Sequence, residues 1–412
     1  MRGRSSRFAR SLPWPRIWCP LCRSAIQCAP TGAPPAFPQG EVLRAEVRAF
    51  LAEHLPRRAI TEGVGSWGGS NREFSRKMGE RGWIGMTWPK RYGGHERSAL
   101  ERYVVLEEML ASGAPVSGHW VADRQSGPLL LRVGTEEQKQ AILPRIAAGE
   151  CSFCIGMSEP DSGSDLASVR TRAAAIAGKS GGGFLVNGTK LWTSNAHRSE
   201  YMILLARTGE AGEQRHGGLT QFLVDLKATQ GLSIRPVHNL SGEHHFNEVV
   251  FQDVFLPAAN VLGEVGGGWQ QVTSELAFER SGPERFLSAF TLLVELTRAL
   301  GPEPSERGRI ALGRFVAHIA TLRRLSRSVA GMLQAGANPA QQAALVKDLG
   351  TTLEQEIPEI ARQLLDAEPD RDSTRDFVKV LAHTMMNAPS FSIRGGTREI
   401  LRGMIARGLG LR

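Results

Sequence analysis

The spacing of apolar residues changes twice along this chain of 412 residues. From residue 41 to about residue 149, apolar side chains recur every three or four positions, which is typical of helices with one buried face. Near residue 151 they appear instead in short β-rich runs, and after the glycines at 266–268 the helical spacing returns and lasts to the end. Helices and strands place side chains with different periods, so each segment favours one of the two. The sequence therefore predicts a mainly α fold with an inserted antiparallel β domain.

The same changes set the expected domain boundaries. We expect a basic leader over 1–40, an N-terminal helical domain over 41–150, a β domain over 151–262 and a C-terminal helical domain over 263–412. The expected strands are 153–157, 184–194, 201–207, 219–226, 232–237 and 247–256. Within one of these runs, the pair Asn187-Gly188 lies between alternating apolar residues and favours a two-residue hairpin turn. The β domain is therefore expected to be a compact barrel or sandwich.

Composition excludes a disordered chain, a collagen and an integral membrane protein. Apolar residues make up 41% of the chain and charged residues 22%, and no apolar run approaches the roughly 18 residues of a membrane-spanning helix. The net charge is +9, but the first forty residues hold six arginines and no acid, so the remainder carries only +3. This weakens the case for nucleic acid binding through a basic face. The arginine-rich leader fits a mitochondrial transit peptide as well as an unused upstream extension, so we expect the mitochondrial matrix in a eukaryote and the cytoplasm in a bacterium.

The five cysteines give little sign of a metal site. They are Cys19, Cys22, Cys28, Cys151 and Cys154, and a Cys-x-x-Cys pair without a second pair at zinc-finger spacing is a poor metal site. The last two stand among apolar strand residues, where free cysteines are most often buried. So few cysteines, in odd number, indicate a reducing compartment.

Motifs of several common enzyme classes are absent. The sequence contains no phosphate loop, no GxGxxG between a strand and a helix, no HExxH and no GxSxG. Three other segments, 156–166, 191–195 and 392–403, combine unusual composition with a strand end or a helix start. The first offers hydroxyls and backbone N–H groups, the second an aromatic plate beside two hydroxyls, and the third a Gly-Gly turn before a helix. Taken singly, each also fits an ordinary turn, a core tryptophan or a plain helix start.

Taken together and in this order, these segments resemble the acyl-CoA dehydrogenase family. The resemblance covers about Glu41 to Arg412 and rests on the stretches 80–94, 134–150, 157–165, 187–196, 251–264 and 395–411. It implies an FAD-dependent enzyme that introduces a double bond between Cα and Cβ of an acyl-CoA thioester. It also implies a helix, β, helix domain order, a homo- or hetero-oligomer of two or four chains, and electron-transfer flavoprotein as the electron acceptor.

The resemblance further implies which residues bind the cofactor and the substrate. Trp192 would pack beside the flavin ring, and Ser194 would hydrogen-bond its N5 edge. Ser164 stands where the family has a serine near the pantetheine and phosphate portion of coenzyme A, and Glu399 replaces a more usual Gln. The residues expected at the cofactor are Ile155, Met157, Ser158, Trp192, Ser194, Thr397 and Glu399.

The base departs from the commonest pattern of the family. Most members carry a Glu in a Glu-Gly-Thr motif at the C-terminal turn, where this chain has Gly395, which cannot accept a proton. A minority, which resembles isovaleryl- and long-chain-type enzymes, carries the base on an earlier helix, before an arginine. That position is Glu279 here, followed by Arg280, which we expect beside the substrate. A water-poor pocket would raise the pKa of Glu279, as suits this base, and the backbone N–H of Gly395 is expected to bind the thioester oxygen.

A second departure concerns the C-terminal domain. Family members usually have RxxFGxPI and QxxGGxG stretches that bind the pyrophosphate and adenine of FAD, and neither occurs here. Arg309, Arg314 and Arg324 lie in the first region as possible phosphate partners. We therefore keep two alternatives to a self-sufficient enzyme that acts on a branched, cyclic or otherwise unusual acyl chain. One is a non-catalytic or half-competent subunit of a heteromer, and the other is a flavin oxidase on the same scaffold.

Overall fold

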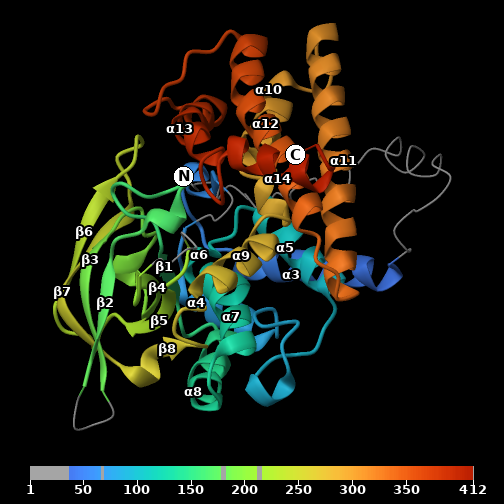
Figure 1. The fold of residues 1–412 in the computed structure, drawn as a ribbon. Helices are drawn as coiled ribbons and strands as arrows, with labels where there is room; N and C mark the ends of the chain where they lie inside the picture. The colour runs from blue at the N-terminus through green and yellow to red at the C-terminus, as the bar shows by residue number, and fades with distance from the viewer. Residues whose placement is uncertain (1–36, 66–68, 178–181, 211–215, 412) are drawn as a thin grey trace, which may run out of the picture.

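The computed structural model of the protein describes residues 37–65, 69–177, 182–210 and 216–411, with the backbone alone at 38–39 and 275–279. Helices come first, a sheet follows, and helices return (Figure 1). The order predicted from the spacing of apolar residues is therefore confirmed. The predicted leader lies outside the described residues except at its end, where the first described helix begins at Pro38.

The N-terminal helices form a layer beside the sheet (Figure 1). Two of them begin with reciprocal caps, in which Ser98 pairs with Glu101 and Thr135 with Gln138, and such boxes satisfy backbone groups that a helix end leaves unpaired. A π-helical turn, η3 (Ala122–Ser126), joins two short helices. The helices are α3 (Pro38–His54), α4 (Arg72–Glu80), α5 (Ala99–Ala111), α6 (Ser117–Val121), α7 (Gly127–Val133) and α8 (Glu136–Ala147), with 3-10 turns η1 (Ile60–Gly63) and η2 (Lys90–Tyr92).

The β domain is one sheet in which β6, β7, β3, β2, β4, β5 and β8 are neighbours in that order, and β1 also pairs with β4. Most pairs are antiparallel, as predicted, but β1 and β2 both run parallel to β4. The sequence patterns indicated six of the strands and missed β2 and β8. The strands are β1 (Phe153–Gly156), β2 (Arg172–Ile176), β3 (Gly183–Lys190), β4 (Tyr201–Arg207), β5 (Leu219–Asp225), β6 (Leu232–His238), β7 (His244–Pro257) and β8 (Val261–Leu262).

The predicted hairpin turn at Asn187-Gly188 is wrong. Both residues lie inside β3, where the register against β7 shifts between Val186 and Gly188. The Asn187 amide donates to the Asp253 carboxylate at 3.0 Å and its oxygen accepts from the Asp253 N–H at 2.9 Å. Asp253 has φ of 50° and Gly188 has φ of 149°. Asn187 and Gly188 therefore form a β-bulge within the continuous strand β3 and not a turn.

The C-terminal helices complete the fold. On α11, Phe315, Ile319, Leu322 and Val329 are all buried and lie on one face of the helix. None of the helices in the described part of the chain is long and apolar enough to cross a membrane. The helices are α9 (Gly268–Glu279), α10 (Phe290–Leu300), α11 (Glu306–Gln334), α12 (Ala340–Leu365), α13 (Asp376–Phe391) and α14 (Arg398–Gly408), with a 3-10 turn η7 (Pro283–Arg285).

The two helical domains share one hydrophobic core although the β domain separates them in sequence. That core includes Phe50 and Val105 from the first domain, and Phe286, Leu292 and Val378 from the last. The sheet has its own core. The helical domains therefore form one body, and the β domain packs beside it (Figure 1).

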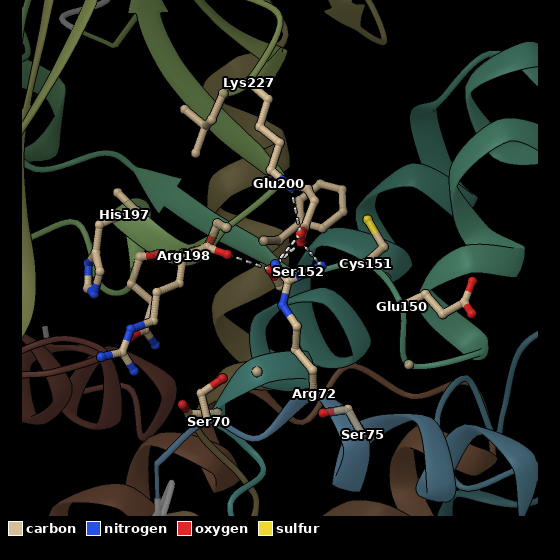
Figure 2. Close-up of a pocket in the computed structure, with 18 of the residues that line it drawn as sticks. Ser70, Arg72, Ser75, Glu150, Cys151, Ser152, His197, Arg198, Glu200 and Lys227 are labelled. Carbon is tan, nitrogen blue, oxygen red and sulfur yellow. Dashed lines mark hydrogen bonds and ion pairs between the residues drawn. The ribbon is translucent and has the colours of Figure 1, made fainter.

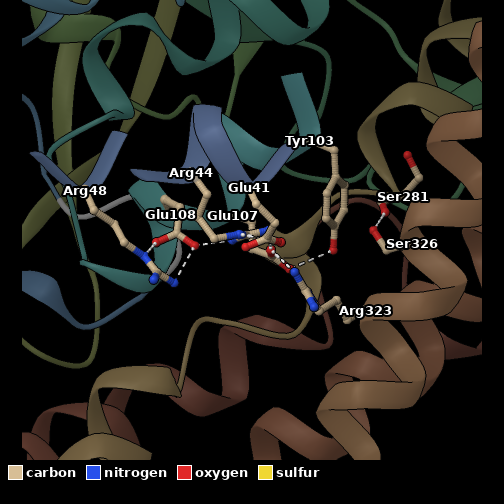
Figure 3. Close-up of polar contacts among 9 residues, drawn as sticks. All are labelled: Glu41, Arg44, Arg48, Tyr103, Glu107, Glu108, Ser281, Arg323 and Ser326. Atoms are coloured by element: carbon tan, nitrogen blue, oxygen red, sulfur yellow. Dashed lines mark hydrogen bonds and ion pairs between the residues drawn. The ribbon is translucent and has the colours of Figure 1, made fainter. Parts of the chain in front are cut away.

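A buried ion network connects α3, α5 and α11 (Figure 3). The Glu107 carboxylate contacts Arg44 at 2.8 Å and Arg323 at 2.6 Å. The neighbouring Glu108 carboxylate contacts Arg48 at 2.7 Å and also pairs with Arg44. Because both carboxylates are almost fully buried, loss of one partner would leave an uncompensated charge in the interior.

Candidate active site

The first group of predicted site residues lies at the end of β1. Ile155 is in the strand and Met157 and Ser158 follow it, and all three are half-buried. Behind them, the fully buried Lys190 donates to the Met157 carbonyl at 3.0 Å and to the Glu159 carboxylate at 2.7 Å. Burial lowers the pKa of Lys190 to about 8, although the Glu159 charge acts in the opposite direction. This pair holds the strand end in place.

The second group lies in the loop after β3. Trp192 has φ of 60° and its indole is 54% exposed, with the Phe246 ring edge-on at 5.7 Å between centroids. Ser194 is half-buried in the same loop. The Leu191 N–H donates to the Ser158 carbonyl at 2.9 Å, so the structure brings the first two groups together. An exposed aromatic plate beside hydroxyls suits a flat heterocycle.

Thr193 adds an observation that the sequence did not indicate. Its backbone pairs with Asn247 through two hydrogen bonds of 3.0 Å, so its position is well defined. Its hydroxyl is buried and hydrogen-bonds to nothing in the described ranges. Most buried polar groups have a hydrogen-bond partner, so this hydroxyl is available to a polar ligand at the loop.

The third group joins the end of α9 to the Gly-Gly turn before α14. Glu279 is the last residue of α9, and its side chain lies outside the described part of the chain. The Arg280 side chain is 2% exposed, and its Nε donates to the Gly395 carbonyl at 2.9 Å. Gly395 and Gly396 have φ of 67° and 96°, a conformation that glycine adopts without strain. Two positions that lie 115 residues apart in sequence are therefore in contact.

Lys347 of α12 also binds this turn. It is fully buried, and its Nζ donates to the Gly396 carbonyl at 2.7 Å. Its neighbour Asp348 accepts hydrogen bonds from Arg398 at 2.9 Å and Arg402 at 3.3 Å, both on α14. Sequence reasoning missed Lys347, because a lone lysine on a helix is usually exposed.

The remaining predicted residues occupy more open positions. Thr397 is half-buried at the start of α14, and Glu399 is exposed in the first turn of that helix. Ser164 is exposed in the loop between β1 and β2. The β domain and the C-terminal helices meet where the Glu243 carboxylate lies 3.0 Å from the His383 ring, whose hydrogen bond lowers the pKa of Glu243 to about 2. The predicted site residues thus come from two domains in contact.

A separate pocket of about 520 Å³ lies between the starts of α4, α6, β1 and β4 (Figure 2). At one wall the Glu200 carboxylate accepts from Arg72 at 2.6 Å, from the Ser152 N–H at 2.9 Å and from Lys227 at 3.3 Å. Burial raises the pKa of the Cys151 thiol beside it to about 12. Residues 195–200, which follow the tryptophan loop, line this pocket, but none of the predicted site residues does. It is therefore distinct from the candidate active site.

Three domain models of one family match almost the whole described chain. They are the acyl-CoA dehydrogenase N-terminal domain over residues 38–150, the middle domain over 154–254 and the C-terminal domain over 266–410. The chain belongs to the acyl-CoA dehydrogenase family. Members are oxidoreductases of fatty acid and lipid metabolism that bind FAD. The flat indole of Trp192, the adjoining hydroxyls and the unpaired Thr193 hydroxyl fit a flavin at this site.

Similar proteins include a chain of a solved complex of two named proteins. "Acyl-CoA dehydrogenase FadE26" of Mycobacterium tuberculosis (strain ATCC 25618 / H37Rv) is 34% identical over 398 residues, which cover 90% of this chain and 97% of that protein. The ChsE4-ChsE5 complex from Mycobacterium tuberculosis contains a chain that is 31% identical, with a TM-score of 0.79. The match covers 92% of this chain and 99% of that one. A chain of the "Tcur3481-Tcur3483 steroid ACAD" is 29% identical, with a TM-score of 0.79, and the match covers 92% of this chain and 98% of that one.

Proposed function

We propose that this chain catalyses the FAD-dependent α,β-dehydrogenation of an acyl-CoA thioester, with Glu279 as the base. The observation that carries the proposal is the 2.9 Å hydrogen bond from Arg280 to the Gly395 carbonyl. Because Glu279 directly precedes Arg280 in the chain, the end of α9 lies at the turn that replaces the more usual base. A carboxylate at this helix end can then serve the same reaction from a different element.

In the proposed reaction, each residue of the site has a defined role. The Glu279 carboxylate takes the proton from Cα, the hydride leaves Cβ with its electron pair, and a double bond forms between the two carbons. Bound FAD supplies the hydride acceptor. Ile155, Met157, Ser158 and Trp192 would hold its ring system. Ser194 would donate a hydrogen bond to its edge, and the Gly-Gly turn would bind the thioester oxygen.

The visible spectrum of the purified protein tests the proposal. Residues 41–412 carrying bound FAD, co-expressed with a related chain where FAD binding requires one, are expected to show oxidised-flavin absorption that bleaches when the matching acyl-CoA thioester is added without oxygen. Glu279→Gln should stop the bleaching but keep the bound flavin, because the amide cannot take the proton. Glu303→Gln, at an exposed position, is the matched control. Full bleaching by the Glu279→Gln variant would show that the base lies elsewhere.

We further propose that the working enzyme is a heteromer with a second, related chain. Two observations favour it. The C-terminal domain lacks the family's usual pyrophosphate and adenine stretches, and the titles of two similar solved structures each join two protein names, one of them as a complex. The steroid named for one of them favours a bulky, cyclic acyl group as the substrate class. A colourless protein that binds FAD only after co-expression with a related chain would support the heteromer. A stable yellow protein that is reduced without a partner would contradict it.

We propose electron-transfer flavoprotein as the electron acceptor, and a flavin oxidase is the alternative to be tested against it. The reduced protein would be mixed with oxygen or with oxidised electron-transfer flavoprotein, and its reoxidation followed by absorbance. Fast reoxidation by the flavoprotein and slow reoxidation by oxygen are expected, because a closed site keeps oxygen and water from the reduced cofactor. The reverse order would identify an oxidase.

A further inference from the structure

Two cationic side chains hold two successive carbonyls of the Gly-Gly turn. Arg280, from the end of α9, donates to the Gly395 carbonyl at 2.9 Å, and Lys347, from α12, donates to the Gly396 carbonyl at 2.7 Å. Both side chains are at most 2% exposed. They reach the turn from different helices, so neither contact follows from the other.

The two contacts decide where the peptide N–H groups point. The described chain contains no cis peptide bond, and in a trans peptide the N–H points opposite to the carbonyl. With both carbonyls held, the N–H groups of Gly396 and Thr397 are directed away from the guanidinium and the ammonium. Within the described ranges, no acceptor binds the N–H of Gly395, Gly396 or Thr397. Three successive donors are therefore available to a ligand at this turn.

Burial of the Lys347 ammonium is costly unless hydrogen bonds or opposite charges compensate for the lost water. Removal of an ammonium from water is far more costly than burial of an apolar side chain of similar length. Because the two glycines already permit the left-handed conformation, a cation is not needed to form the turn. Its hydrogen bond to the Gly396 carbonyl fixes the orientation of the peptide plane between Gly396 and Thr397.

We propose that Lys347 is a positioning residue of the dehydrogenation, which orients the Gly395-Gly396-Thr397 turn so that its N–H groups meet the thioester oxygen. This inference rests on the proposed function. Preorganised donors stabilise the negative charge that develops on that oxygen as the α-proton leaves, and they stabilise it more than they stabilise the ground state. Arg280 assists through the first carbonyl. In this role Lys347 acts on the reaction through the turn.

Substitution of Lys347 in the assembled, FAD-bound enzyme tests the proposal. Lys347→Met fills the same space without a donor, and Lys347→Gln keeps a donor without the charge. Asp348→Asn is the matched control, because it weakens the contacts from α12 to Arg398 and Arg402 and leaves the carbonyl contact intact. The measurements are the rate of anaerobic flavin reduction per bound FAD, KM, the melting temperature, and the infrared carbonyl frequency of a bound ¹³C-labelled thioester.

The expected result is a loss of rate without a matching loss of binding or stability. Loss of one donor to a developing oxyanion typically costs about 10²–10³-fold in rate, so Lys347→Met should lower flavin reduction about 10²-fold with little change in KM. Lys347→Gln should retain part of the rate. The bound carbonyl frequency should shift toward that of the free thioester in Lys347→Met and not in Asp348→Asn.

Other results separate failure of this inference from failure of the proposed function. If the wild-type enzyme is reduced by a thioester but Lys347→Met matches Asp348→Asn in rate and carbonyl frequency, the positioning role is wrong and the dehydrogenase function stands. If Lys347→Met only melts earlier and keeps its rate per flavin, Lys347 is structural. If no thioester reduces the wild-type enzyme or shows a shifted carbonyl, the proposed function fails and the inference fails with it.

Discussion

His119 should make the folded protein sensitive to mild acid. Its ring is 4% exposed in α6, and its Nδ1 lies 2.8 Å from the Ser75 hydroxyl. Burial lowers the pKa of His119 to about 4 from an ordinary value of 6.5, although Asp123 acts in the opposite direction. The unfolded chain therefore takes up a proton as the pH falls through 6.5, and the folded protein does not until about pH 4. The contribution to stability is complete above pH 6.5 and is lost as the pH falls toward 4.

The size of the effect follows from linkage. A shift of one pKa unit corresponds to about 1.4 kcal/mol, so the full contribution of His119 is about 3 kcal/mol, of which about 2 kcal/mol is lost between pH 8 and pH 5. His119→Asn keeps a polar atom near Ser75 but cannot take up a proton. The free energy of unfolding, measured with urea at pH 8 and pH 5, should therefore fall by about 2 kcal/mol less in the variant than in the wild type.

The exposed His318 provides the control, because its ring is already in water. His318→Asn should lose as much stability between the two pH values as the wild type. If His119→Asn shows the same loss as the wild type, the buried ring does not titrate as argued, and the burial of His119 is not the cause of acid sensitivity.

Three further predictions concern other buried groups. Glu107→Gln should destabilise the protein by about 3–5 kcal/mol in urea titrations, because the buried Arg44 and the half-buried Arg323 lose a charged partner; a loss below about 1 kcal/mol would contradict the role of the network. Gly396→Ala should slow flavin reduction at least about tenfold, since a Cβ there lies 3.0 Å from a buried guanidinium and φ of 96° disfavours alanine; a rate equal to that of the wild type would refute this. Cys151 and Cys154 should resist alkylation at pH 8 until the protein unfolds, because burial raises both pKa values to about 12; rapid labelling counted by mass spectrometry would show that the thiols are accessible.

Local patterns predicted much of the fold. The change of period near residue 151 and the return after 266–268 correctly divided helices from strands, because burial of one face imposes a period on each element. The prediction of a hairpin at Asn187-Gly188 was wrong because a residue that is distant in sequence determines the conformation there. Asp253 on β7 binds Asn187 and converts a favourable turn sequence into a bulge. Nothing near Asn187 in sequence identifies that partner.

The site residues stay a prediction. Motif resemblance proposed Trp192 and Gly395, and the structure places each of them beside others of the predicted group. The buried lysines 190 and 347 were missed, since a charged residue in a helix or strand is usually exposed. Their roles depend on which carbonyls the folded chain brings within reach. That information lies in tertiary contacts and not in local spacing.

β1 and β2 both pair in parallel with β4, and these pairings fix the two ends of the loop over 157–171. β1 ends opposite Leu204 and β2 begins opposite Arg207, so the two strands lie end to end along one edge of β4. The loop leaves the sheet and returns about 10 Å further along, at roughly 3.3 Å per residue. It is an Ω-shaped excursion whose ends the sheet holds close together. Each doubling of such a loop costs only about 0.6 kcal/mol in closure entropy, so its length can change between relatives, or by design, without a change in strand register, provided that Glu159 remains to pair with the buried Lys190.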